Sequence, residues 1–154
     1  MQYVVTGAAG FIGSTIVDSL LRHGDPDVTV IGIDSFTDYY DPRIKRSNVV
    51  SARDSRFTLL DCDLQDPSAI RSVATADVVF HQAGQPGVRR SWGSDLETYT
   101  SRNIGATQSL LEASIDNANL KAFVYASSSS VYGDAETYPT RETDLPRPRS
   151  PYGV

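Results

Sequence analysis

Short runs of apolar residues alternate with longer amphipathic stretches over most of the chain. We expect strands at the apolar runs of residues 2–6, 28–33, 57–60, 77–80 and 122–126. The run of residues 28–33 is rich in β-branched residues, which is typical of a strand buried on both faces of a sheet. Strands that alternate with helices predict an α/β fold, in which a doubly wound parallel sheet carries helices on both faces. The crossovers between its strands are expected to be right-handed.

Amphipathic periodicity and helix-ending residues locate the helices. The apolar face of the first helix is expected to consist of Ile12, Ile16, Val17, Leu20 and Leu21. Gly24 and Pro26 end this helix, and Pro67 occupies a tolerated first-turn position of a later one. A long amphipathic helix is expected over residues 92–114, with Trp92 as a packing anchor. His23 is expected near the end of the first helix, where the dipole favours it.

The chain changes character after residue 133, where prolines lie in a polar stretch. We expect an ordered loop over an active site there, and a disordered tail is the alternative. Neither reading places a further strand or helix in this segment.

Composition narrows the class of protein. A length of 154 residues suggests one domain, and 40% hydrophobic residues are enough to bury a core. The net charge of −5 argues against a nucleic-acid binder, and the chain has no run of 18 apolar residues that would indicate a membrane span. The N-terminus lacks the pattern of a signal peptide. The single cysteine, Cys62, excludes an internal disulfide and is expected to be a buried structural thiol in a cytoplasmic protein.

A glycine-rich turn follows the first strand, and it reads Gly7-Ala8-Ala9-Gly10-Phe11-Ile12-Gly13. A diphosphate that lies on a helix N-terminus needs backbone N–H groups at close range, and side chains there would block it. Gly7 is expected to allow the tight turn and Gly10 the close approach of the phosphates. Gly13 is expected to let helix and strand pack closely.

Asp34 lies 21 residues after Gly13, at the end of the second predicted strand. A carboxylate at this point can accept hydrogen bonds from both hydroxyls of the adenosine ribose, and it would repel a 2′-phosphate. The pattern therefore predicts a dinucleotide site that prefers NAD to NADP. The alternative is an ordinary turn followed by an aspartate that caps a strand.

The Gly-x-x-Gly-x-x-Gly spacing resembles that of the extended short-chain dehydrogenase/reductase family, whose NAD-binding domain is a Rossmann fold. Further segments that resemble motifs of this family are Asp61–Leu64, His81–Gln85, Asn103–Thr107, Ser127–Gly133 and Ser150–Gly153. By this resemblance Asp63 would contact the adenine amino group and Leu64 the adenine ring. The full set of cofactor contacts that it implies is Gly7, Gly10, Phe11, Ile12, Gly13, Asp34, Ser35, Asp63, Leu64, Gln82, Ala83, Gly84, Asn103, Ala126, Ser127 and Tyr152.

Within this family the chain looks most like the nucleotide-sugar 4-epimerases. Residues 38–45 and 86–91 resemble segments of UDP-glucuronate 4-epimerases, and UDP-glucose 4-epimerases are similar too. A 4,6-dehydratase usually has Asp-Glu after its catalytic threonine, whereas Ser129 and Ser130 follow Ser128 here. A dehydratase or decarboxylase remains the alternative enzyme, and a non-catalytic NAD-binding module is the alternative from another class.

The resemblance also implies a mechanism. The hydride of the sugar C4–H needs a cofactor as acceptor, and the proton of the 4-hydroxyl needs a base. Tyr152 is expected to be this base, and Ser128 to hydrogen-bond the same oxygen in a 4-keto mechanism. Arg89 is expected to hold a carboxylate or phosphate of a UDP-sugar, although a solvated loop arginine is an equal alternative. His81 is expected to have a structural role, bonding a backbone group.

The family motif has a lysine four residues after its tyrosine, which here would fall beyond Val154. The chain is therefore expected to be the NAD-binding part of a longer homodimeric enzyme, without its substrate domain and inactive when isolated. If the strand order is 3-2-1-4-5, residues 122–126 form an exposed apolar edge. Such an edge invites pairing with another chain.

Overall fold

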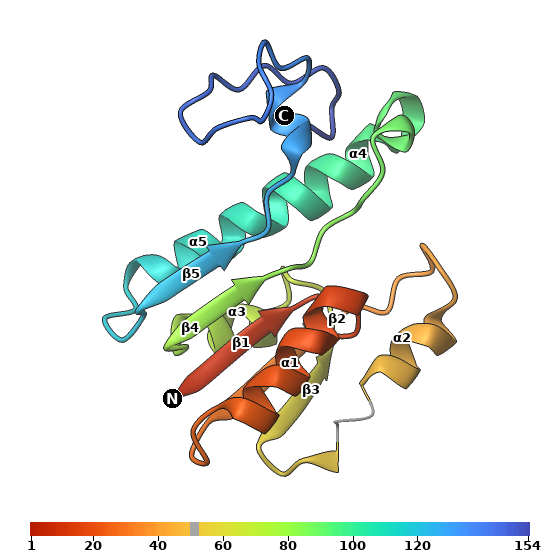
Figure 1. The fold of residues 1–154 in the computed structure, drawn as a ribbon. Coiled ribbons are helices and arrows are strands. Elements are labelled where there is room, and N and C mark those ends of the chain that lie inside the picture. The colour runs from red at the N-terminus through yellow and green to blue at the C-terminus, as the bar shows by residue number, and fades with distance from the viewer. Residues whose placement is uncertain (50–52) are drawn as a thin grey trace. The chain divides into compact units, whose positions relative to one another are not determined.

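The computed structural model describes residues 1–49 and 53–154. Five parallel strands form one sheet in the order β3-β2-β1-β4-β5 (Figure 1). The strands are β1 (Gln2–Thr6), β2 (Thr29–Asp34), β3 (Phe57–Asp61), β4 (Val78–His81) and β5 (Ala122–Tyr125). All five predicted strands and the predicted order are confirmed, with each strand end within one residue of its expected position.

Three helices follow the first three strands or the loops after them. α1 (Phe11–His23) ends where the Gly24 N–H donates to the carbonyl of Leu20. α2 (Pro42–Asn48) and α3 (Pro67–Ala74) each begin with a proline behind an aspartate. The aspartates, Asp41 and Asp66, accept a backbone N–H from the first turn of the helix, which is the usual N-cap arrangement. Proline needs no N–H partner at this position.

The core lies on both faces of the sheet because successive strand residues point to opposite sides. Val5 and Val30 pack with Val17 and Leu21 of α1 on one face. The other face is covered by α3 and by α5 (Ala106–Ile115), and its buried residues are Val4, Ile33, Leu64, Ala69, Val73, Ala76, Val79, Ala106 and Leu110. Helices on both faces confirm the doubly wound architecture. Ile12, expected on the buried face of α1, lies in the first turn of this helix and is 60% exposed.

The long helix expected over residues 92–114 differs in detail. It begins with α4 (Leu96–Tyr99), passes through the π-helical segment η4 (Thr100–Gly105) and continues as α5. Two 3-10 turns, η2 (Arg89–Ser91) and η3 (Gly93–Asp95), precede it. The prediction that Trp92 is a packing anchor of the helix is wrong. Its backbone is extended between the two turns, and its side chain is 59% exposed. Cys62 is half-buried, and not fully buried as expected.

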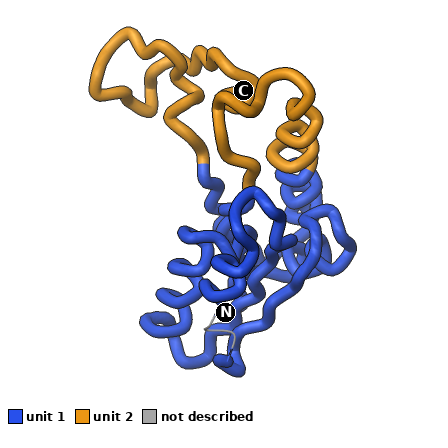
Figure 2. The backbone as a smooth tube through the Cα atoms, turned by 90° about the vertical axis from the view of Figure 1, so that its right-hand side faces the viewer, with its two compact units in different colours: residues 1–83, 106–126 blue, residues 84–105, 127–154 orange. Residues whose placement is uncertain are grey.

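The chain forms two compact units (Figure 2). Unit 1 comprises residues 1–83 and 106–126 and contains the whole sheet. Unit 2 comprises residues 84–105 and 127–154, and it contains α4, η4 and the 3-10 turn η5 (Ser129–Tyr132). The expectation of one NAD-binding domain over residues 1–154 stays a prediction.

The segment after residue 133 has no helix or strand but is held within unit 2. The Arg147 N–H donates to the carbonyl of Val131 at 2.9 Å, and Arg149 pairs with Asp134 at 2.8 Å. An ordered loop is therefore the reading that the structure supports, and its position over an active site stays a prediction. Across the described ranges, no helix is long and apolar enough to cross a membrane.

β5 occupies one end of the sheet and is exposed. The side chains of Val124 and Tyr125 are 42% and 53% accessible, respectively. The expected exposed edge is therefore present in unit 1, and its pairing with another chain stays a prediction.

Candidate functional site

The turn after β1 requires glycine at its first position. Gly7 has φ +65°, and a Cβ built on it would lie 2.9 Å from the backbone nitrogen of Ala83. Residues with a side chain rarely adopt this φ. Gly7 therefore gives the tight turn that the sequence predicts, and it also lets the loop after β4 approach the turn after β1.

Gly13 joins α1 closely to this turn. A Cβ on Gly13 would lie 2.1 Å from the carbonyl oxygen of Gly7, which no side chain can do without moving the backbone. At Gly10 a Cβ would meet only the same oxygen, at 3.2 Å, and the backbone is extended. Gly13 thus has the predicted packing role, whereas Gly10 leaves open space above the turn.

The N-terminus of α1 is free to receive an anion. The first N–H groups of a helix, here those of Phe11, Ile12 and Gly13, have no carbonyl partner inside the helix. Gly10 provides no side-chain cap, and the first turn contains no acidic residue. Phe11 and Ile12 are 82% and 60% exposed. This end of α1 therefore presents backbone donors and the positive end of the helix dipole to an incoming phosphate.

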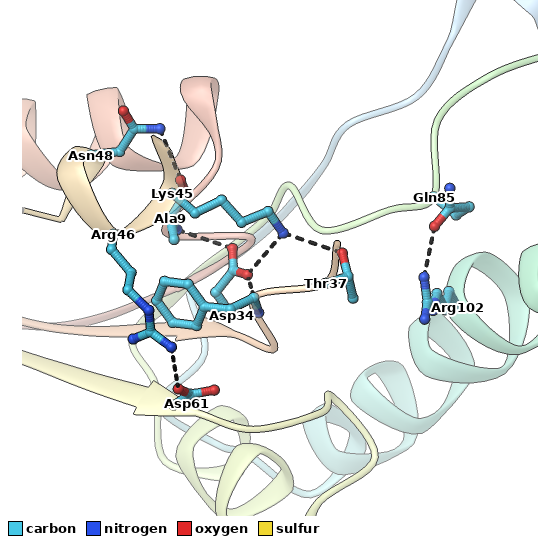
Figure 3. Close-up of polar contacts among 10 residues, drawn as sticks. Ala9, Asp34, Thr37, Lys45, Arg46, Asn48, Asp61, Gln85 and Arg102 are labelled. Carbon is cyan, nitrogen blue, oxygen red and sulfur yellow. Dashed lines mark hydrogen bonds and ion pairs between the residues drawn. The ribbon is translucent and has the colours of Figure 1, made fainter. Parts of the chain in front are cut away.

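Asp34 ends β2 and points toward the glycine turn (Figure 3). Its side chain is buried, with 7% exposed. Oδ2 accepts the N–H of Ala9 at 3.1 Å and Oδ1 accepts that of Phe36 at 2.8 Å. These bonds hold the carboxylate at the carboxyl end of the sheet, where ligands bind in open α/β folds.

Lys45 makes a buried ion pair with Asp34, which sequence reasoning missed. The Lys45 ammonium lies 3.3 Å from Asp34 Oδ1 and donates to Thr37 Oγ1 at 3.2 Å (Figure 3). It also lies 5.4 Å from the centre of the Tyr40 ring. Lys45 is only 7% exposed. Lysine is almost never buried to this extent without a charged partner, and here the partner is Asp34. In the sequence, Lys45 is marked by its place in the segment of residues 38–45, and this resemblance gives no role to any single residue.

Arg46 and Asn48 of α2 complete the polar surroundings of Asp34. The Arg46 guanidinium stacks over the Phe36 ring at 4.7 Å and lies 3.9 Å from Asp61. The Asn48 side-chain amide donates to the carbonyl of Ala9 at 3.0 Å (Figure 3). α2 is therefore attached both to the glycine turn and to the end of β3.

The segment expected at the adenine edge lies at the end of β3. Asp63 is exposed, and its Oδ1 accepts the N–H of Gln65 at 3.0 Å, which leaves acceptor capacity on the carboxylate. Leu64 is 8% exposed and packs in the core between the sheet and α3, so little of its side chain is accessible to a ligand. Ser35 is exposed after β2. Adenine contacts by Asp63 and Leu64 stay predictions.

His81 ends β4 as a neutral, structural residue. Its Nδ1 lies 2.7 Å from Thr6 Oγ1 and its Nε2 lies 2.9 Å from Thr107 Oγ1. Burial lowers the pKa of His81 to about 4. The predicted structural role fits, but its partners are side-chain hydroxyls and not the expected backbone group. Thr6 Oγ1 also accepts the N–H of Ala83 at 3.1 Å, so this network holds the loop of Gln82 and Ala83 against β1.

Unit 2 begins with Gly84 and Gln85, which Asn103 of η4 holds in place. Asn103 accepts the N–H of Gln85 at 2.6 Å and donates to its carbonyl at 3.1 Å. The Gln85 side chain, 8% exposed, accepts from Arg102 at 2.8 Å (Figure 3). Asn103 therefore clamps a loop, and its expected contact with a cofactor stays a prediction.

Ser128 and Tyr152 both lie in unit 2, on neighbouring segments. Ser128 caps η5, and its Oγ accepts the N–H of Ser130 at 3.2 Å. A Cβ on Gly153 would lie 2.7 Å from the carbonyl oxygen of Ser130, so the segment of Tyr152 packs on the segment of Ser128. The side chains of Ser128 and Tyr152 are half-buried. Ala126 and Ser127, which precede Ser128 in the chain, are exposed. The described structure contains no hydrogen bond between the two side chains.

Arg89 is exposed in η2, and its guanidinium makes no ion pair in the described ranges. The neighbouring Arg90 lies 3.8 Å from Asp95. Arg89 therefore keeps its charge available for an anion, and its role in substrate binding stays a prediction. No cluster of acidic, histidine or cysteine residues that could hold a metal ion occurs in residues 1–49 and 53–154.

Several proteins have sequences similar to that of this chain. The chain is 41% identical over 155 residues to the uncharacterized UDP-glucose epimerase YtcB of Bacillus subtilis, and it covers 48% of that protein. It is 38% identical over 144 residues to UDP-glucuronate 4-epimerase 4 of Arabidopsis thaliana. This match includes 92% of this chain and 32% of the Arabidopsis protein. The chain thus spans about half or less of the length of these relatives.

Solved structures show the same fold. The UDP-glucuronic acid 4-epimerase of Bacillus cereus, in complex with UDP-glucuronic acid and NAD, has a TM-score of 0.90 and 41% identity, and 99% of this chain covers 48% of that one. The UDP-N-acetylglucosamine 4-epimerase of Methanobrevibacter ruminantium has a TM-score of 0.84 and 33% identity. The match covers 99% of this chain and 46% of that one. Residues 3–154 match the model of one family. The chain belongs to the NAD-dependent epimerase/dehydratase family.

Proposed function

We propose that the chain supplies the NAD-binding part of a UDP-sugar 4-epimerase of the UDP-glucuronate or UDP-glucose type. The observation that carries this proposal is the uncapped N-terminus of α1 beside the Asp34 carboxylate at the carboxyl end of the sheet. Diphosphate and ribose hydroxyls need this pair of features at this place in the fold. The names of the relatives, which are UDP-glucose, UDP-glucuronate and UDP-N-acetylglucosamine epimerases, support the substrate class.

The residues present fit NAD. The N–H groups of Phe11, Ile12 and Gly13 would hold the diphosphate, and the open space at Gly10 would admit it. Asp34 accepts three hydrogen bonds from the protein, whereas a carboxylate offers about four acceptor sites. One site therefore remains for a ribose hydroxyl. When bound, NAD would supply the hydride acceptor and donor that oxidation and reduction at the sugar C4 require.

Tyr152 and Ser128 are proposed to handle the proton of the sugar 4-hydroxyl. In the described ranges Tyr152 contacts its neighbours through its backbone N–H and its ring, and its side-chain oxygen has no hydrogen-bond partner. In its deprotonated form this oxygen would take up the proton of the sugar 4-hydroxyl and become a neutral phenol. Because Ser128 Oγ already accepts the Ser130 N–H, its own proton is available to donate to the sugar oxygen. The 4-keto sugar would then rotate in the site, so that the hydride returns to the opposite face of C4. Arg89 is proposed to bind a carboxylate or phosphate of the substrate.

The experiment is turnover of UDP-glucuronate and UDP-glucose by the protein in its complete natural length, followed by NMR of the sugar C4 proton. Formation of the C4 epimer supports the proposal, and a matched Tyr152→Phe variant should lose it. Release of a 4-keto-6-deoxy sugar would identify a dehydratase. NAD binding without any turnover would identify a binding module. We propose that a polypeptide of residues 1–154 alone is inactive, since it spans 48% of a relative with this activity in its name. The homodimeric state and the cytoplasmic location of the longer enzyme stay predictions.

A further inference from the structure

Ser91 holds the backbone of Tyr152. It is fully buried at the end of η2, and its hydroxyl donates to the carbonyl of Val88 at 2.7 Å. The same oxygen accepts the N–H of Tyr152 at 3.2 Å. A serine hydroxyl has one proton, and Ser91 donates it to the carbonyl oxygen of Val88. Its lone pairs are thereby turned toward Tyr152, so the position of this residue depends on the 88–91 turn.

Tyr99 holds the ring of Tyr152. The two rings meet edge to face, with centres 6.3 Å apart and planes at 86°. This is a preferred aromatic arrangement. Tyr99 is itself 3% exposed, and its hydroxyl lies 2.8 Å from the carbonyl oxygens of both Pro86 and Gly87. The ring against Tyr152 is therefore anchored at its far end.

The chain on either side of these contacts is also held. Asn103 bonds both backbone groups of Gln85, which restrains the start of the 86–99 segment. On the other side, the Gly153 N–H donates to the carbonyl and the hydroxyl oxygen of Ser150, at 2.9 and 3.1 Å. These bonds close a tight turn around Tyr152.

We propose that Ser91 and Tyr99 are positioning residues for Tyr152. Ser91 sets the place of the Tyr152 backbone and Tyr99 sets the plane of its ring, while the Tyr152 hydroxyl stays free for the sugar. Neither residue touches the reacting atoms. This inference rests on the proposed function, in which Tyr152 is the base. Misplacing a base lowers the rate of proton transfer more than it lowers the affinity for cofactor or sugar.

The test uses the protein in its complete natural length. Ser91→Ala removes the acceptor for the Tyr152 N–H, and we expect kcat to fall about tenfold, as for the loss of one hydrogen bond. Tyr99→Leu removes the ring contact and should lower kcat at least as much. Tyr99→Phe keeps the ring and should lower kcat less than Tyr99→Leu. The KM for the UDP-sugar and the Kd for NAD should stay within about twofold.

Two controls make the outcome decisive. Ser94→Ala alters an exposed serine on η3 and should leave kcat unchanged. Ser91→Thr keeps the hydroxyl and should restore kcat above that of Ser91→Ala. Wild-type kcat in both Ser91→Ala and Tyr99→Leu would overturn the inference, as would a parallel loss of kcat, NAD affinity and thermal stability. If Tyr152→Phe remained active, the proposed function would fail first and the positioning role with it.

Discussion

Replacing Gly13 with alanine should separate α1 from the glycine turn. The added Cβ would lie 2.1 Å from the Gly7 carbonyl oxygen and 2.7 Å from its carbon, so α1 must move by about 1 Å to restore an ordinary contact. Overpacking costs ~1–3 kcal/mol, and the upper end applies because both partners are backbone. Alanine returns up to ~1 kcal/mol of helix propensity. We expect a net loss of about 2 kcal/mol in the free energy of unfolding.

The same shift should weaken NAD binding. Hydrogen bonds to a charged phosphate contribute about 1.5–3 kcal/mol each, and a 1 Å displacement of the helix N-terminus would lose at least one of them. We expect the Kd for NAD to rise about tenfold or more. Urea unfolding and calorimetric titration measure the two effects on the same sample. Ser19→Ala, on the exposed side of α1, is the matched control and should change neither. Wild-type stability and NAD affinity in Gly13→Ala would refute the packing role of Gly13.

Four further changes probe other parts of the site. Gly10→Val should abolish NAD binding, measured by calorimetry, and keep the urea midpoint, because its methyl groups fill the open space above the turn; unchanged affinity would remove the phosphate from this turn. Wild type should prefer NAD to NADP, and Asp34→Asn should weaken NAD binding by ~1–3 kcal/mol while sparing a hydrogen bond for Lys45; equal affinity of wild type for both cofactors would contradict the ribose assignment. Since the pKa of His81 is lowered to about 4, from about 6.5 unfolded, its contribution of about 3 kcal/mol is present above pH 6.5 and is lost as the pH falls toward 4. His81→Gln should flatten this part of the curve of unfolding free energy against pH, and an unchanged curve would contradict the assignment. Tyr152→Phe should lose nearly all turnover but bind NAD normally, and more than a tenth of wild-type activity would remove Tyr152 as the base.

The strands and the glycine turn could be predicted because local chemistry determines them. Strands of a parallel sheet coincide with short apolar runs, and the runs in this chain end within one residue of the observed strands. Gly7 and Gly13 could be identified because only glycine fits a positive φ or a backbone contact of this closeness. Each of these signals lies within a few residues of the feature that it predicts.

Other features depend on contacts that local patterns do not contain. The π-helical segment of residues 100–105 has Ile104 as its single large apolar residue, so apolar periodicity cannot distinguish it from the α-helices on either side. Large apolar residues usually pack, which predicts that Trp92 belongs to the helix, but its segment turns before α4 begins. The ion pair of Lys45 with Asp34 joins α2 to β2, and its partners could be found only with the fold in hand.

NAD binding at the N-terminus of α1 can be tested most directly by NMR, with NAD added to ¹⁵N-labelled protein of residues 1–154. We expect saturable shifts of the backbone N–H signals of Phe11, Ile12 and Gly13 and of those around Asp34. The same addition to Gly10→Val should leave these signals in place. Binding of NAD that shifts signals elsewhere and leaves the N–H groups of Phe11 to Gly13 unmoved would contradict a dinucleotide site on this helix.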